Sequence, residues 1–334
     1  MAGAKSNNNT TSLPRFFTPL LVLFVFTLGT LTLAITTGSV HISNQELWQV
    51  LHGGGEPLHR TLVFELRLPR ALSAFAAGGL LAVAGALMQV LLRNPLADPY
   101  LLGLSGGAAV GALLAMLSGL SAAAVSGSAF IGAMISAVTV FGLAHGTGSW
   151  TPTRLLLTGV VIASGWGAAI TFMLAVSPSD QLPGMLYWLM GDLAYARSPW
   201  MALTVLAIIS VVMLPLGRSL NVLARGQMQA SALGVSVRPL EWTIYISASL
   251  LTAFAVTTAG SIGFVGLIVP HMLRLVLGND QRLILPAATL AGGALLTLAD
   301  TLARTLIAPE QLPAGVITAL IGVPSFLYLL HRSR

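Results

Sequence analysis

Three arginines stand at the ends of apolar segments, and two of them are hard to explain there. Arg67 and Arg70 flank Leu68 and Pro69 just before a long apolar run, and Arg304 closes another run. Proline suits the first turn of a helix, and residues three apart share one helix face. Arg67 and Arg70 thus stand at the start of a helix, where the helix dipole disfavours cations. The residues therefore predict either a cationic patch that receives an acidic partner, or interfacial arginines that reach from the lipid to water.

A second set of residues matches a sequence motif of serine hydrolases. Gly103, Ser105 and Gly107 match the pattern Gly-x-Ser-x-Gly, and His271 is available as a base further along the chain. In hydrolases this turn follows a β-strand, whereas here the surrounding residues are small and helical in pattern. We therefore predict no catalytic residue, and keep an intramembrane serine hydrolase as a remote alternative.

A stand-alone carrier or channel is the nearer alternative. Carriers coupled to protons or sodium ions place carboxylates in the middle of the membrane. Asp300 is the only acid well inside an apolar run, and Arg304 one turn later is spaced to pair with it. This pairing argues against a coupled carrier.

Energy from nucleotide hydrolysis would have to come from another protein. A phosphate-binding loop needs a lysine after its glycines, and the only lysine is Lys5 in a polar tail. The polar segment Arg218–Glu241 lies between two apolar runs, and Gly226 and Gly234 bracket one short helix within it. This segment is expected to lie across the cytosolic end of the bundle, where a separate soluble protein that hydrolyses the nucleotide would bind and move it.

Composition makes this an all-α membrane protein. Of 334 residues, 55% are hydrophobic and 8% are charged, against about 25% charged in soluble domains. There is no cysteine, which excludes disulfides and thiolate metal sites, and the basic residues are too scattered for nucleic acid. About ten spans follow from apolar runs of roughly 20 residues, with a loop over residues 36–65. They are Phe16–Ile35, Leu68–Leu92, Leu96–Leu117, Val125–Ala144, Leu155–Val176, Trp200–Leu216, Trp242–Ala259, Val265–Leu277, Leu283–Leu306 and Pro313–Leu330.

The charges orient these spans. With both termini in the cytosol, eleven basic residues fall inside and five outside, as the positive-inside rule requires. Phe16–Ile35 is longer than the core of a signal peptide and lacks a clear cleavage site, so we expect it to stay as a span. Glycines four residues apart, Gly103, Gly107 and Gly111, predict close helix packing.

Seven motifs in order give the chain a family resemblance. It resembles the FecCD-type permease subunits of bacterial ABC importers for iron chelates, haem and vitamin B12, over nearly its whole length. The motifs are RLPR at Arg67–Arg70, GALMQ at Gly85–Gln89, RNPLAD at Arg93–Asp98, LGLSG at Leu102–Gly106, GSIGFVGLIVPH at Gly260–His271, LPAG at Leu312–Gly315, and the loop with Gly226 and Leu233–Gly234.

The resemblance implies the fold of a type II ABC importer permease. Residues 1–334 would form one transmembrane permease domain, with a cytosolic tail over 1–14 and a cytosolic coupling loop over 218–241. Two copies would surround a central pathway in the bacterial inner membrane. Two ATPase subunits carrying ATP and Mg²⁺ would bind below, and a periplasmic or lipid-anchored binding protein would dock above. The chain itself would bind no cofactor and no metal, and the residues do not choose between haem, siderophore and cobalamin.

The resemblance also assigns roles to individual residues. Those expected to dock the binding protein are Arg67, Arg70 and Arg304. Those expected to engage the ATPase are Gly226, Gln227, Gln229, Ala230, Leu233 and Gly234. Those expected to form the cytoplasmic gate are Asn94, Leu96, Pro152 and Thr153. The chain departs from the family pattern at Gln227, where a glutamate is usual, at Ser231, where a basic residue is frequent, and at Pro152, where a polar residue is usual.

Overall fold

The helices expected from the apolar runs make up the protein. The computed structural model describes residues 13–38, 42–145, 151–194, 196 and 198–332, and no strand occurs among them. The all-α prediction is therefore confirmed. The helices are α1 (Leu13–Thr36), α2 (Asn44–Leu51), α3 (Pro57–Thr61), the π-helical η1 (Leu62–Arg67), α4 (Leu68–Leu91), the 3-10 helix η2 (Pro99–Leu102), α5 (Leu104–Leu117), α6 (Ala122–His145), α7 (Pro152–Val176), α8 (Leu182–Met190), α9 (Trp200–Met213), α10 (Gly217–Leu223), α11 (Gln227–Ala232), α12 (Val237–Ala259), α13 (Val265–Leu277), α14 (Gln281–Thr305) and α15 (Ala314–Arg332).

Among the residues that the structure describes, fewer than ten helices are long enough to cross a membrane on their own. In the described part of the chain six helices pass by length and composition, and the pair α9 and α10, bent by 71°, makes a seventh. Three more apolar helices are shorter, namely Leu104–Leu117, Val265–Leu277 and Ala314–Tyr328. The count of ten spans is thus not confirmed. The 13 residues of α13 extend only about 20 Å, less than the ~30 Å of a hydrocarbon core.

Several predicted boundaries were wrong for local reasons. Residues 36–65 are not simply a loop, because Ser43 and Glu46 form a capping box that starts α2, and α3 runs through η1 into α4. The third span begins at Leu104 and not at Leu96, since Pro99 opens a short 3-10 helix and Gly103 then turns at φ 68°. The predicted tail 1–14 lies outside the described residues except for Leu13 and Pro14, which belong to α1.

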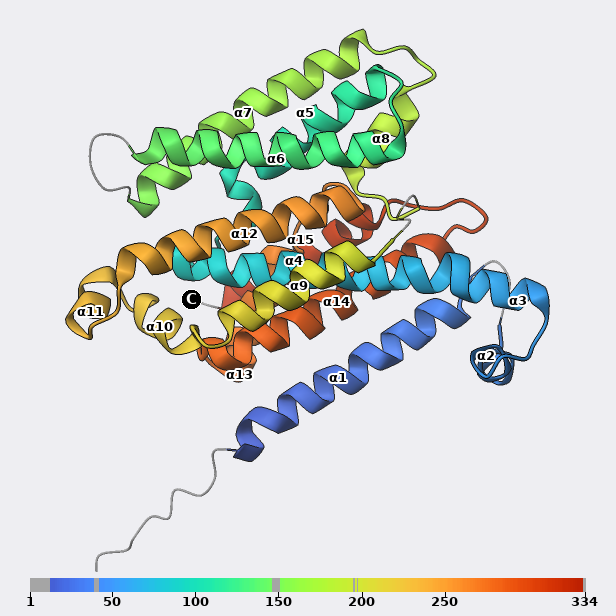
Figure 1. The fold of residues 1–334 in the computed structure, drawn as a ribbon, viewed down its shortest axis with the longest axis horizontal. Coiled ribbons are helices and arrows are strands. Elements are labelled where there is room, and N and C mark those ends of the chain that lie inside the picture. Colours follow the sequence, from blue (N-terminus) through green and yellow to red (C-terminus); the bar gives the residue numbers. More distant parts are fainter. Residues whose placement is uncertain (1–12, 39–41, 146–150, 195, 197, 333–334) are drawn as a thin grey trace, which may run out of the picture.

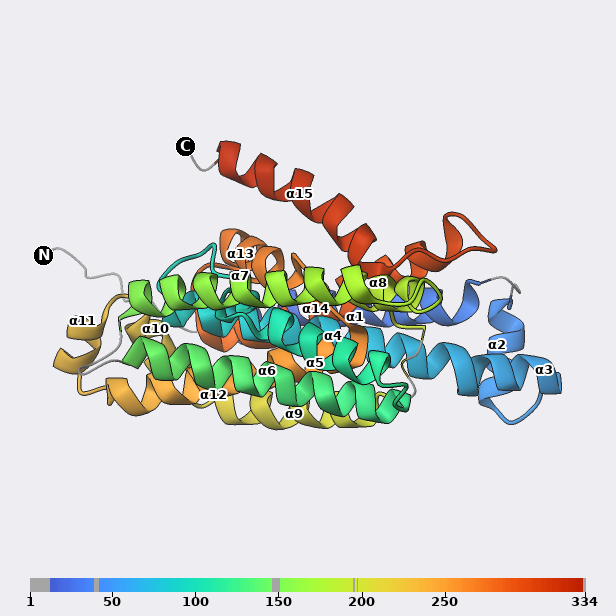
Figure 2. The same ribbon diagram turned by 90° about the horizontal axis from the view of Figure 1, so that it is seen from above.

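Helix α4 is the centre of the bundle, and glycines let its neighbours approach it. It runs through the middle in both views, between α12, α13 and α14 (Figures 1 and 2). A Cβ on Gly78 would overlap the backbone of Gly292 in α14, and one on Gly85 would overlap that of Gly266 in α13. Gly107 and Gly132 meet in the same way between α5 and α6. The close packing expected from small residues is confirmed.

The other helices surround this centre unevenly. Helices α5, α6 and α7 form a separate layer on one side of α4 and α12 (Figure 1). Helix α1 lies along the opposite side, and α15 tilts away from the bundle (Figure 2). Helix α7 begins three residues earlier than expected, at Pro152, because Thr151 caps it by accepting a hydrogen bond from the backbone N–H of Arg154.

Candidate functional site

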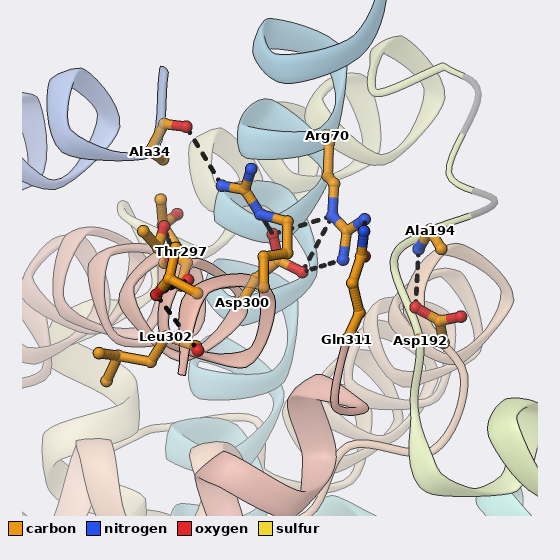
Figure 3. A network of polar contacts seen from close by, with 11 residues as sticks. Ala34, Arg70, Asp192, Ala194, Thr297, Asp300, Leu302 and Gln311 are labelled. Carbon is orange, nitrogen blue, oxygen red and sulfur yellow. Dashed lines mark hydrogen bonds and ion pairs between the residues drawn. The ribbon is translucent and has the colours of Figure 1, made fainter. Parts of the chain in front are cut away.

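The predicted arginine patch is a buried ion network around one carboxylate. The guanidinium of Arg70 donates from Nε to Oδ2 of Asp300 at 3.0 Å and from Nη2 to Oδ1 at 2.8 Å. Arg304 Nε lies 3.2 Å from Oδ2 of the same carboxylate, so the pairing expected from the one-turn spacing is confirmed. Asp300 is 1% exposed. The fork geometry and the burial make this a strong charge-assisted contact. Gln311 accepts a further hydrogen bond from Arg70, as Figure 3 shows.

Arg67 and Arg304 also hold the end of α1, which was not foreseen. Nη1 of Arg67 donates to the carbonyl oxygens of Ile35 and Thr36 at 2.8 and 3.2 Å, and Nη2 of Arg304 donates to Ala34 at 3.1 Å. The last carbonyls of a helix lack partners within it and form the negative end of its dipole. The two arginines therefore cap α1. No local sequence signal reveals this, because the partners are 31 to 270 residues apart.

The network remains positive overall. Arg70 and Arg304 share Asp300, and Arg67 adds a third positive charge that acts electrostatically on Arg304. Asp192 is the next acid in the electrostatic surroundings of Arg70. Burial raises the pKa of the Asp192 carboxyl, although the backbone N–H of Ala194 donates to it at 2.8 Å (Figure 3). The network thus carries a net positive charge, although its arginine side chains are largely buried. The docking role of Arg67, Arg70 and Arg304 stays a prediction.

The predicted coupling helix forms where expected. Helix α11 covers Gln227–Ala232, with Gly226 at φ 133° before it and Gly234 at φ 78° after it. Ala230 is buried against the bundle, while Leu233 is 71% exposed. Met228, which no sequence pattern singled out, is 88% exposed. The short helix and the residue that follows it thus present two large apolar side chains outward, beside the exposed Gln229.

The unusual Gln227 has a partner that explains it. Its Nε2 donates a hydrogen bond to Oε1 of Glu241, and Glu241 is 5% exposed at the start of α12. An amide donates to a buried carboxylate, whereas a glutamate at the same place would repel it. This contact ties α11 to α12.

We expect Gln227→Glu to loosen α11. Two carboxylates would face each other at a partly buried site. Their repulsion destabilises the folded contact by about 1–3 kcal/mol unless one of them takes up a proton. Limited proteolysis of the segment around α11 should therefore become faster at pH 8 and return toward the wild-type rate near pH 5. Gln229→Glu, on an exposed position of the same helix, is the matched control. Equal cleavage of all three proteins at pH 8 would contradict this role for Gln227.

The predicted gate residues lie in the turn after α4 and in the first turn of α7. Oδ1 of Asn94 accepts a hydrogen bond from the backbone N–H of Leu96 at 2.9 Å, and Leu96 is 37% exposed. Pro152 and Thr153 form the first turn of α7. The end of α4 and the start of α7 lie at the end of the bundle that also carries α10 and α11 (Figure 1). Their gating role stays a prediction.

The hydrolase motif has no catalytic geometry. Ser105 lies in the first turn of α5, and its Oγ is 2.6 Å from Oγ of Ser261. Its partner is therefore another serine and not His271. Among the described residues no three His, Asp or Glu side chains gather into a metal-binding group.

Known proteins match along nearly the whole chain. The model of the FecCD transport family matches residues 22–332. The chain is 45% identical over 277 residues to the cobalamin import system permease protein BtuC of Halobacterium salinarum, covering 81% of this chain and 74% of that protein. It is 38% identical over 324 residues to the hemin transport system permease protein HmuU of Yersinia pestis, covering 94% of each. A solved structure described as an inward-facing, metal-chelate type ABC transporter superposes with a TM-score of 0.84 at 30% identity, covering 94% and 98% of the two chains.

These matches decide between the alternatives that the residues left open. The family consists of transporter permeases and not of enzymes, so the intramembrane hydrolase is excluded together with the stand-alone carrier. The resemblance seen in the motifs is confirmed. The chain belongs to the FecCD transport family and is a permease subunit of an ABC importer.

Proposed function

We propose that this permease moves a large metal chelate, such as haem, a ferric siderophore or cobalamin, into the cytoplasm across a bacterial inner membrane. The relatives named for hemin and cobalamin and the metal-chelate type structure support this substrate class. The permease acts as a pair of identical copies around a central pathway. Two ATPase subunits that hold ATP and Mg²⁺ drive it, and a periplasmic or lipid-anchored binding protein delivers the substrate.

The observation that carries this proposal is the separation of two polar regions along α4. Arg70 lies in the first turn of α4, whereas α10, which leads into α11, packs near its last turn. The 24 residues of α4 cover about 36 Å, enough to reach from one membrane face to the other. In this arrangement the arginine network faces the binding protein, and α11 faces the ATPase in the cytosol with both termini.

The transport mechanism requires two alternative packing arrangements of the helix bundle. Met228 and Leu233 enter a groove on the ATPase, so closure of the ATPases on ATP moves α11. The contact between Gln227 and Glu241 passes this movement to α12. The two gates then open alternately, and ATP supplies the free-energy difference between the packings.

Arg70→Gln tests the docking face. In this variant Asp300 keeps its ion pair with Arg304 but loses the hydrogen bonds from Arg70, so the unfolding temperature is measured beside uptake. In vesicles with the ATPase and a loaded binding protein, we expect ATP-dependent uptake to fall at least about tenfold, the effect of one charge-assisted contact of ~1.5 kcal/mol. ATP hydrolysis without binding protein should stay unchanged.

Arg60→Gln is the control, since Arg60 is an exposed arginine in α3, which leads into α4 through η1. Wild-type uptake by Arg70→Gln would remove the docking role but leave the transporter assignment standing. Uptake by the wild-type permease without any ATPase would overturn the proposed function itself.

A further inference from the structure

A polar cavity near the end of α4 is lined by three arginines to which the proposed transport mechanism assigns no individual role. It has a volume of about 570 Å³ and lies between the end of α4, α10, α13 and the turn before α14. We call it the arginine pocket, after Arg93, Arg225 and Arg274, which come from three separate places in the chain. Its other polar lining residues are Gln89, Asn221, Asn279, Asp280 and Gln281.

The pocket has a surplus of positive charge. Asp280 is the one carboxylate among the described lining residues. It accepts hydrogen bonds from Nη2 of Arg282 at 2.6 Å and from Nδ2 of Asn221 at 2.8 Å. The bonds from Arg282 hold the pKa of Asp280 near 2, so the two charges cancel at any physiological pH. Within the described part of the chain, no ion pair joins the arginines of the pocket to an acid. Glu241 acts on Arg93 electrostatically but does not line the cavity.

The deepest arginine is held in place by neutral groups. Nη1 of Arg274 donates to Oε1 of Gln89 at 2.6 Å, and Nη2 donates to the carbonyl of Ala86 at 3.3 Å. These bonds orient the guanidinium and leave its charge unneutralised. Gln281, 2% exposed, also lines the cavity, and its Oε1 has no hydrogen-bond partner in the described structure. A pre-oriented cation and an unsatisfied amide oxygen suit a ligand that carries both an anion and a hydroxyl.

Arg93 takes a backbone conformation that favours glycine. Its φ is 49°, at the position where α4 ends with hydrogen bonds from the backbone N–H groups of Arg93 and Asn94 to Val90 and Gln89. Helices commonly end at such a left-handed residue, and glycine is preferred there because it has no Cβ. A strained backbone conformation points to a function when it brings a charged side chain to a site. Here it brings a third guanidinium to the cavity.

We propose that the arginine pocket binds a phosphate group. A phosphate presents several oxygens, which match the planar forks of converging arginines better than a single carboxylate does. The cavity is larger than a phosphate alone, and its amides can bond the hydroxyls of an attached glycerol or sugar. Basic pockets between membrane helices suit the headgroups of anionic lipids, and a soluble phosphorylated compound offers the same chemistry. Bound phosphate would link α4, α10 and α13.

Arg93→Gly combined with Arg225→Gln tests the pocket without threatening the fold. Glycine removes the guanidinium of Arg93 and relieves its backbone strain, so the thermal stability of the variant should equal or exceed that of the wild type. The full chain is purified in neutral detergent. Bound phosphatidylglycerol is counted by native mass spectrometry, with phosphatidylcholine as the neutral lipid, and inorganic phosphate is titrated by calorimetry. We expect one saturable anion site, at least tenfold weaker in the double variant and weaker at higher salt.

Arg154→Gln is the matched control, because Arg154 is exposed at the start of α7 and does not line the cavity. Saturable phosphatidylglycerol binding that inorganic phosphate does not displace assigns the site to a lipid headgroup. Saturable binding of inorganic phosphate assigns it to a soluble ligand. Absence of both in the wild type, or equal binding by the wild type and the stable double variant, overturns the proposal.

Discussion

Asp300→Asn is expected to lower the unfolding temperature of the permease by on the order of 10 °C. The change removes the carboxylate that Arg70 and Arg304 share, and the side chains of these arginines are 13% and 10% exposed. Removing one partner of a buried ion pair costs about 3–5 kcal/mol, because the remaining charge stays buried without compensation. Heat-induced loss of monodisperse protein in detergent measures the effect.

The same change should free the end of α1. Arg304 would no longer be held beside the carbonyl of Ala34, so protease sites near the end of α1 should become accessible. Glu310→Gln is the control, since Glu310 is an exposed acid shortly after the end of α14. A surface change of that kind costs within about 0.5 kcal/mol. If Asp300→Asn and Glu310→Gln unfold at the same temperature, the network does not stabilise the protein.

Gly85→Leu is expected to abolish the folded permease. The side chain would enter the space occupied by the backbone of Gly266, so α4 and α13 would have to move apart. Overpacking by one or two methylenes costs about 1–3 kcal/mol. A leucine against backbone should exceed about 4 kcal/mol, beyond the range of ordinary substitutions. The yield of monodisperse protein after membrane extraction should fall to background, with Gly85→Ala intermediate.

Gly127→Leu provides the comparison for this prediction. Gly127 is an exposed glycine of α6. Apart from its own helix, no described residue has an atom within 4 Å of the place where a Cβ would stand, so leucine there meets open space. Helix propensity favours leucine over glycine by about 1 kcal/mol, and the yield should match or exceed that of the wild type. Similar yields for Gly85→Leu and Gly127→Leu would show that the contact between α4 and α13 is not needed for folding.

Local patterns in the sequence predicted the helices and several of their ends. A long apolar run predicts a membrane helix, because a segment in lipid must form all its backbone hydrogen bonds within itself. The glycines at 226 and 234 predicted α11 because positive φ is open to glycine at little cost. The predictions failed where two local signals competed, as between Leu96 and Leu104. There Pro99 and Gly103 interrupt a run that hydropathy alone reads as continuous.

Contacts between distant segments were decided only by the tertiary structure. The sequence by itself determined an all-helical membrane permease of the FecCD type and the pairing of Asp300 with Arg304. It also predicted an outside source of energy, which stays a prediction. It did not determine that Arg67 and Arg304 cap α1, that Arg70 shares Asp300, or that Gln227 binds Glu241. Sequence periodicity and charge spacing predict contacts only within about one or two helical turns. These partners lie farther apart in the sequence and meet only after the bundle has packed around α4.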